Sequence, residues 1–229
     1  MACKNSVDIQ PEVGPEVKKV SVSPRSISPL EKTFIENGLS NVGLEIPEID
    51  IDLKYSTTDN FLHKDVYGDL DQAYLQPDVL IKLKQAYNYL QKKDSSLTFV
   101  IYDASRPLSV QKKMWKILEM PLDEKGKYLS NPARGSVHNY GAAVDISLIY
   151  KNGQALDMGT PFDYFGELAE PQLENKMLNE GKLTTQQINN RKILREVMQK
   201  SGFRQMPTEW WHYNSCSREQ AKMKYKIIE

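Results

Sequence analysis

The sequence predicts a single α+β domain with a central antiparallel sheet flanked by helices. Strand-like and helix-like patterns are mixed along the chain without the regular β-α-β alternation of a parallel α/β fold. The dipeptide Asn152-Gly153 follows the most apolar strand candidate, and Asn-Gly is typical of a hairpin turn between antiparallel strands. The length of 229 residues suits one domain with a substantial core.

The first half of the predicted domain begins near Leu30. Residues 46–55 alternate apolar and polar side chains, the period of a half-buried strand. Residues 78–93 carry apolar side chains at helical spacing, and Pro77 suits the start of that helix. Residues 97–102 are rich in β-branched and aromatic side chains and predict a second strand.

A loop over 103–107 is expected to lead into a helix that Ser109 caps and that continues to about Glu119. The apolar run 142–150 predicts a strand that ends in a turn at 151–153.

The last predicted helix covers Thr185–Ser201, and Gly202 is well placed to end it in the left-handed conformation. Short strand pieces are expected at 203–205 and 210–213.

The charge balance restricts the classes of partner. Thirty Lys and Arg residues offset thirty Asp and Glu residues, so the formal net charge is zero. Nucleic acids and anionic membrane surfaces attract proteins with a basic excess, and this chain has none. A nucleic-acid partner is therefore not expected, and the composition leaves the oligomeric state open.

The N-terminal segment 1–29 is polar and contains several Pro and Ser residues, a composition typical of a flexible tether. Cys3 lies at its start, as the lipid-bearing cysteine does in processed bacterial lipoproteins. This pattern favours a location in the bacterial cell envelope or periplasm with a membrane tether through lipidated Cys3. The alternative is a cytoplasmic protein with a disordered leader.

A metal site in this chain depends on His and carboxylate ligands, because the only other cysteine is Cys216.

Three histidines occur in the chain, and His138 lies seven residues before Asp145 in the predicted strand. The small residues between them allow the backbone to turn tightly, so both side chains can reach one pocket. A carboxylate within an apolar strand needs a compensating partner, such as a metal ion, an arginine or backbone amides. His63, by contrast, is expected to be a surface or loop residue.

Glu209 and His212 form the second polar group, in the segment Glu-Trp-Trp-His. A catalytic zinc site needs three protein ligands, an open position for water and a base beside that water. His212 suits the third ligand and Glu209 suits the base, although His212 could instead belong to an aromatic cluster. Residues three apart on a regular strand point to opposite faces, so an irregularity near Thr208-Glu209 is required.

Arg106 lies at the junction of a strand and a loop, and Pro107 restricts the backbone around it. A fixed guanidinium could stabilise the negative charge of a tetrahedral intermediate. An ion pair with Asp103 is the alternative interpretation.

These motifs resemble those of the zinc D,D-peptidase superfamily, which shares its fold with the hedgehog signalling domain. The pattern S-x-H-x-x-G-x-A-x-D corresponds to residues 136–145, and E-x-W-H corresponds to residues 209–212. Within the superfamily, the chain is most similar to D-alanyl-D-alanine dipeptidases of the vancomycin-resistance type. The likeness extends from roughly Asp52 to Tyr213, about two thirds of the chain.

The resemblance implies that the catalytic domain, residues 30–229, hydrolyses D-alanyl-D-alanine and related D,D-dipeptides in cell-wall metabolism. It implies one zinc ion per chain, a small dipeptide substrate and the following site residues. The metal ligands are His138, Asp145 and His212; the catalytic residues are Glu209 and Arg106; the substrate-binding residues are Asp163, Tyr55 and Ser136. Residues Asn139-Tyr140 depart from the family pattern beside the pocket, which bears on the preference for D-alanyl-D-alanine and not on the metal site.

Two other functions remain compatible with the sequence. One is a D,D- or L,D-carboxypeptidase that acts on longer peptidoglycan stem peptides with the same zinc residues. The other is a zinc domain that binds peptidoglycan without catalysis, and a base at Glu209 argues against it.

Overall fold

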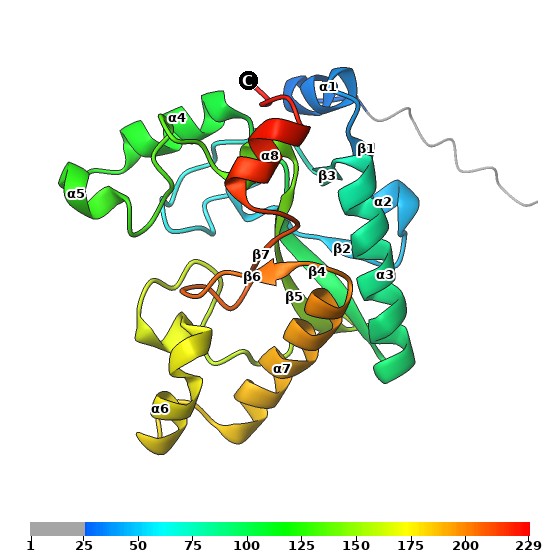
Figure 1. Ribbon diagram of the computed structural model, residues 1–229, viewed down its shortest axis with the longest axis vertical. Helices are drawn as coiled ribbons and strands as arrows, with labels where there is room; N and C mark the ends of the chain where they lie inside the picture. The colour runs from blue at the N-terminus through cyan, green and yellow to red at the C-terminus, as the bar shows by residue number, and fades with distance from the viewer. Residues whose placement is uncertain (1–25) are drawn as a thin grey trace, which may run out of the picture.

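The computed structural model describes residues 26–229, and a central sheet of five strands organises them (Figure 1). Its order across the sheet is β2 (Asp50–Ile51), β4 (Leu97–Asp103), β5 (Ala143–Tyr150), β7 (His212–Asn214) and β6 (Arg204–Gln205). The predicted α+β class is confirmed, and three of the four neighbouring pairs are antiparallel. The pair β2–β4 is parallel, because the chain between these strands crosses over through a helix. A separate two-stranded sheet pairs β1 (Ser40–Asn41) with β3 (Tyr74–Leu75).

Helices α3 (Pro77–Lys93) and α7 (Thr185–Lys200) pack against each other and against the central sheet (Figure 1). Both were predicted within one residue at each end. Most of their apolar side chains recur at helical spacing and are buried, and the opposite faces are mainly polar. Gly202 has a φ of 89° and ends α7 in the left-handed conformation, as expected.

The other helical elements are short and surround this central layer. They are α1 (Pro29–Glu36), α2 (Val42–Glu45), α4 (Leu108–Ile117), α5 (Leu122–Lys125), α6 (Glu174–Asn179), α8 (Arg218–Lys224) and the 3₁₀ turns η1 (Lys54–Ser56), η2 (Val137–Tyr140), η3 (Glu167–Ala169) and η4 (Pro171–Leu173). Helix α4 begins at Leu108 after Pro107, so the prediction that Ser109 is the cap was wrong. Proline at this position presets the backbone for the helix that follows.

The predicted strand over 46–55 was too long. The strand covers only Asp50–Ile51, with one further bond from the Asp52 amide to the Ile101 carbonyl at 2.9 Å, and the chain then turns into η1. The carbonyl oxygen of Tyr55 accepts hydrogen bonds from the amides of Val66 and Tyr67, at 2.9 and 3.1 Å. The loop at Val66-Tyr67 therefore binds the Tyr55 carbonyl, which a longer strand would have used to bond to the sheet.

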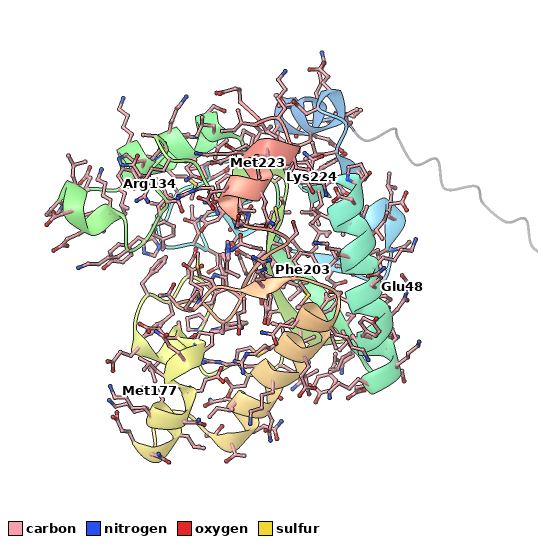
Figure 2. The ribbon with its side chains drawn as sticks, in the orientation of Figure 1. Glu48, Arg134, Met177, Phe203, Met223 and Lys224 are labelled. Atoms are coloured by element: carbon pink, nitrogen blue, oxygen red, sulfur yellow. The ribbon has the colours of Figure 1, made fainter. Side chains whose placement is uncertain are left out.

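One principal hydrophobic cluster runs through the domain from Phe34 to Ile228, near the C-terminus. A smaller cluster joins Met177 of α6 to Leu183 and Ile188, at the end of the molecule where Figure 2 labels Met177. Across the described residues, no helix combines the length and apolar character needed to span a membrane. Cys3 and most of the predicted tether 1–29 lie outside the described residues.

Candidate metal centre and active site

Three polar side chains form a row across neighbouring strands of the central sheet. Asp103 of β4 pairs with Asp145 of β5, and Asp145 pairs in turn with His212 of β7. The pairing of β4 with β5 shifts between Ile101 and Asp103, so that Tyr102 is an extra residue. Strand alternation would have placed Asp103 on the face of Ile101, and this β-bulge turns it to the face of Asp145.

His138 reaches the same place from η2, which directly precedes β5 in the chain. The hydroxyl of Ser136 accepts a hydrogen bond from the His138 amide at 3.3 Å and so caps the turn. Gly141 ends the turn with a φ of 65°, in the left-handed region. A Cβ atom at Gly141 would lie 2.9 Å from both Leu39 and Ser105, so this turn needs glycine for space as well as for conformation.

Hydrogen bonds at the outer nitrogens of the two histidines define which nitrogen faces the site. His138 Nδ1 lies 2.6 Å from the carbonyl oxygen of Ala104, and His212 Nε2 lies 3.0 Å from Asn214 Oδ1. A carbonyl or amide oxygen can only accept a hydrogen bond, so in the neutral rings these outer nitrogens carry the hydrogens. The inner nitrogens, His138 Nε2 and His212 Nδ1, are then left with lone pairs.

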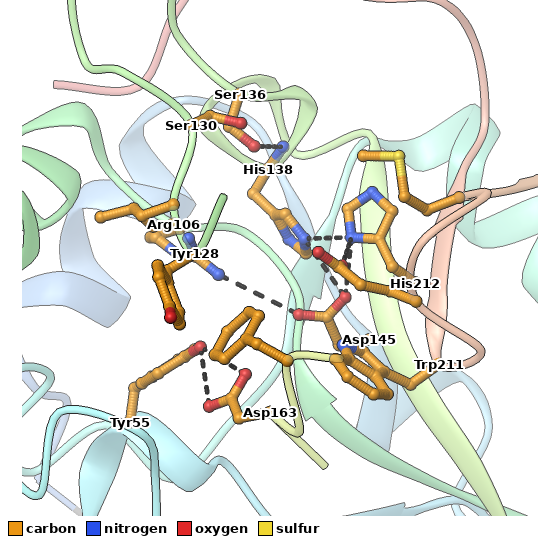
Figure 3. A pocket seen from close by; sticks show the side chains of 14 residues that line it. Tyr55, Arg106, Tyr128, Ser130, Ser136, His138, Asp145, Asp163, Trp211 and His212 are labelled. Atoms are coloured by element: carbon orange, nitrogen blue, oxygen red, sulfur yellow. Dashed lines mark hydrogen bonds and ion pairs between the residues drawn. The ribbon is translucent and has the colours of Figure 1, made fainter. Parts of the chain in front are cut away.

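These inner nitrogens converge with the carboxylate of Asp145 (Figure 3). His212 Nδ1 lies 3.2 Å from His138 Nε2 and 2.9 Å from Asp145 Oδ1. All three residues are buried, and their ligand atoms lie within 4.8 Å of one another. Three buried electron-pair donors that face one another at these distances need a cation between them, either a proton or a metal ion. His138, Asp145 and His212 therefore fit a metal ion and could hold one.

The same crowding perturbs the pKa of His212. Burial by itself would lower the pKa, but the hydrogen bond and negative charge of Asp145 outweigh burial and raise it to about 9. When no metal ion is bound, the charge of Asp145 therefore favours a proton on His212 in the place of the cation.

Glu209 lies beside this group of donors and outside it. Its Oε2 atom is 3.8 Å from His212 Nδ1, and its side chain is 22% exposed. A turn at Pro207-Thr208 precedes it, and β7 begins only at His212. The irregularity required by the spacing of Glu209 and His212 is therefore present. Burial raises the pKa of the Glu209 carboxyl above its ordinary value.

Arg106 is held by Asp103 and faces the same space. Its Nε and Nη2 atoms donate to Asp103 Oδ2 at 3.0 and 2.5 Å, and Nη2 lies 4.0 Å from Asp145. Asp103 also accepts a hydrogen bond from the Tyr67 hydroxyl at 2.6 Å. The ion pair considered as the alternative role of Arg106 is real, and it is what fixes the guanidinium at the site.

Asp163 and Tyr55 lie on the other side of the cavity, 108 residues apart in the chain. The Tyr55 hydroxyl lies 3.1 Å from each carboxyl oxygen of Asp163 (Figure 3). Burial, and next the negative charge of Asp145, raise the pKa of Asp163 well above its ordinary value. A carboxyl in this position gains from a cationic partner, which would stabilise its charged form.

A cavity of about 430 Å³, including its open mouth, joins these groups. Every residue that the sequence predicted for the site lines it: Tyr55, Arg106, Ser136, His138, Asp145, Asp163, Glu209 and His212. His63 is exposed and lies in a loop, as predicted, and it is not among the lining residues of this cavity. Asn139 is also absent from the lining, since its amide donates to the Arg106 carbonyl and to Gln111, at 2.8 and 3.1 Å.

Several residues of the site were missed by the sequence analysis. Asn214 could have been found, because it lies two positions after His212 on one strand and thus on the same face. The carbonyl of Ala104 and the ring pair Tyr128–Phe165, with centroids 4.8 Å apart, belong to loops without a periodic pattern. Only their packing reveals them.

Comparison with known proteins agrees with this geometry. The family described as D-ala-D-ala dipeptidase matches residues 36–228, a range that contains every residue of the site named above. A D-alanyl-D-alanine dipeptidase of Escherichia coli is 30% identical over 175 residues, covering 76% of this chain and 83% of that protein. Enzymes of the same name from Enterococcus faecalis and Enterococcus faecium are 27% and 28% identical, covering 78% and 71% of this chain and 92% and 83% of their own. With its buried His-Asp-His group and a family match over most of its length, the chain belongs to the D-ala-D-ala dipeptidase family of metallopeptidases.

Proposed function

We propose that the protein is a zinc-dependent dipeptidase that hydrolyses D-alanyl-D-alanine and related D,D-dipeptides to free D-amino acids. One observation carries the proposal: a three-donor group, a neighbouring carboxyl base and a second carboxyl suited to a cation line one cavity. The donor group and the base would supply the metal ion and the proton acceptor for peptide hydrolysis. The second carboxyl would bind the free amino terminus of the substrate.

His138, Asp145 and His212 would hold one zinc ion per chain. Two imidazoles and one carboxylate are a donor set typical of catalytic zinc, and three protein ligands leave a position open. When bound, zinc makes a water molecule more acidic and polarises the peptide carbonyl. The bonds of His138 to Ala104 and of His212 to Asn214 orient both rings for this role.

Glu209 is the proposed general base. Its carboxylate removes a proton from the attacking water as the water oxygen bonds to the peptide carbon. The same proton then passes to the leaving nitrogen as the peptide bond breaks. A carboxyl whose pKa burial raises is better suited to both transfers than one with an ordinary pKa.

Arg106 is the proposed stabiliser of the tetrahedral species. Asp103 binds one side of its guanidinium and fixes its orientation. The other side can therefore stabilise the negative charge that develops on the substrate oxygen without reorganisation. The ring of Tyr55, with its centroid 5.1 Å from Arg106 Cζ, further restricts where the guanidinium can lie.

Asp163 and Tyr55 are the proposed binding site for the ammonium group of the substrate, and Ser136 is a proposed contact of the bound dipeptide. An ammonium group beside Asp163 would give this buried carboxyl a cationic partner. A peptide with an acylated amine could not form that ion pair, and this difference favours a dipeptidase over a carboxypeptidase.

We further propose that the enzyme works on dipeptides of cell-wall origin in the bacterial envelope, tethered through a lipid on Cys3. The alternative is a cytoplasmic enzyme. Mass spectrometry of the native protein tests the tether, because an unmodified N-terminal peptide containing Cys3 would rule it out.

The direct test is release of D-alanine from D-alanyl-D-alanine by the zinc-loaded protein, with a chelated sample and N-acetyl-D-alanyl-D-alanine as controls. Cleavage of the free dipeptide alone, lost on chelation, is expected. Preferential cleavage of the acetylated substrate would indicate the carboxypeptidase, and no cleavage of either would favour a binding module.

A further inference from the structure

Arg191 of α7 is buried, with no exposed side-chain surface, and no part of it lines the cavity. Its Nε atom donates to the carbonyl oxygen of Met158 at 2.6 Å, and its Nη2 atom donates to that of Leu168 at 2.9 Å. These two carbonyls lie at the two ends of residues 159–167, the segment that carries Asp163. The guanidinium of Arg191 therefore fixes the separation between the two ends of this loop.

The loop holds a backbone conformation that needs such support. Asp163 has a φ of 59°, in the left-handed region that residues other than glycine occupy infrequently. Such a conformation persists where the surrounding structure determines it from several directions. The Tyr55 hydroxyl donates to the Asp163 carboxyl, whereas Arg191 binds the backbone of the loop from the side of α7.

Trp210 connects the same loop to the segment of the proposed base. Its Nε1 atom donates to Thr160 Oγ1 at 2.7 Å, and the Arg191 Cζ atom lies 5.7 Å from the centroid of its ring. Trp210 directly follows Glu209 in the chain. Arg191 and Trp210 thus hold the Asp163 loop at a set position relative to the opposite end of the cavity.

Arg191 also forms an ion pair with Glu174, but this contact leaves one of its donors without a hydrogen bond within the described part of the chain. Its Nη1 atom lies 3.7 Å from Glu174 Oε1 and has no hydrogen-bond partner among the described residues. Glu174 instead accepts a 2.6 Å hydrogen bond from Arg195, one turn further along α7. Leaving a buried donor unsatisfied is costly, so a side chain chosen only to fill the core would not be arginine.

We propose that Arg191 is a positioning residue, which clamps Met158 and Leu168 and thereby sets Asp163 at the distance from Glu209 that a dipeptide requires. This inference rests on the proposed function of Asp163. Lysine can replace the charge and much of the volume of Arg191, but its single nitrogen lacks the planar fork that reaches both carbonyls. Arg191→Lys is therefore the informative substitution.

The test is a double-mutant cycle of Arg191→Lys with Asp163→Asn, measured with free D-alanyl-D-alanine. Arg191→Lys is expected to lower kcat/KM by about tenfold or more, mainly through KM, with zinc content unchanged. In the Asp163→Asn background it should have no further effect, because a residue that acts through Asp163 has nothing left to position. An effect of equal size in both backgrounds would overturn the proposal, and so would wild-type kinetics in Arg191→Lys.

Arg195→Lys is the matched control. Arg195 contacts Glu174 and donates to Gln205 at 2.7 Å, and no hydrogen bond from it to residues 158–168 is present in the described structure. Its effect should be the same in both backgrounds. If Arg191→Lys does not fold, Thr160→Val removes the contact of Trp210 with the same loop. This substitution should lower kcat/KM in the wild type and have no further effect in the Asp163→Asn background.

Amide hydrogen exchange separates failure of this inference from failure of the proposed function. Residues 159–167 should exchange faster in Arg191→Lys than in the wild type or Arg195→Lys. A wild-type protein without turnover would refute the proposed function alone, and hydrogen exchange would still test the positioning role of Arg191. Unchanged exchange of residues 159–167 in Arg191→Lys would overturn that role.

Discussion

The imidazole of His138 donates from Nδ1 to the carbonyl oxygen of Ala104 across 2.6 Å, and this bond turns Nε2 toward His212. A side-chain substitution does not remove a backbone carbonyl, so the course of the loop after β4 sets the orientation of the His138 ring. His212 is oriented in the same way, but by the side chain of Asn214, which can be replaced.

Asn214→Ala is therefore expected to weaken metal binding by about 10- to 100-fold without removing a ligand. His212 would lose the acceptor that keeps the hydrogen on Nε2, and its ring would rotate more freely. Competition with a metal-binding dye measures the change. Asn189→Ala, an exposed position on α7, should bind metal as the wild type does; an equal loss in both variants would remove Asn214 from this role.

Glu209→Gln should keep the metal and lose turnover by about 10²- to 10⁴-fold, since the amide has nearly the same shape but cannot accept the proton. Metal content by mass spectrometry and D-alanine release are to be measured on the same sample. Turnover near the wild-type rate with full metal occupancy would exclude Glu209 as the base.

Asp163→Asn is expected to reduce kcat/KM for the free dipeptide by about 100-fold, because the ammonium group of the substrate loses its buried ionic partner. An N-acetylated dipeptide carries no ammonium group, and binding of this compound as a competitive inhibitor should change little. Equal weakening of both compounds would show that Asp163 does not recognise the amine.

Metal uptake is expected to release about one proton per site at neutral pH, because metal and proton compete for the same nitrogen. Asp145 raises the pKa of His212 to about 9, so the metal-free protein is protonated there at pH 7 and must lose that proton to bind. Apparent affinity should rise about tenfold per pH unit up to pH ~9 and then level off. Calorimetry in buffers of different ionisation enthalpy counts the protons, and a pH-independent affinity would contradict the assignment.

Gly141→Ala should destabilise the fold by about 1–3 kcal/mol, since alanine is strained at a φ of 65° and its Cβ would crowd Leu39 and Ser105. Because the same turn carries His138, metal affinity should fall with stability. Gly126→Ala is the control, with a φ of −63° and no atom within 4 Å of the added Cβ. Denaturant unfolding of both variants with and without metal measures the difference, and equal stabilities would show that the turn tolerates a side chain.

Local patterns in the sequence determined the parts of this protein that depend on neighbours in the chain. The helices near 77–93 and 185–200 follow from apolar spacing and end signals, which act within a few residues. The pairs His138–Asp145 and Glu209–His212 are close in sequence, so each could be recognised as half of a site, and the family resemblance joined the halves.

Only the tertiary structure decided the contacts between segments far apart in the chain. The bulge that turns Asp103 toward Asp145 depends on the register of two strands more than 40 residues apart. The clamp of Arg191 on Met158 and Leu168 likewise joins a helix to a loop without periodicity. Such contacts are chosen by packing and by the need of buried polar groups for partners, and neither leaves a repeating pattern in the sequence.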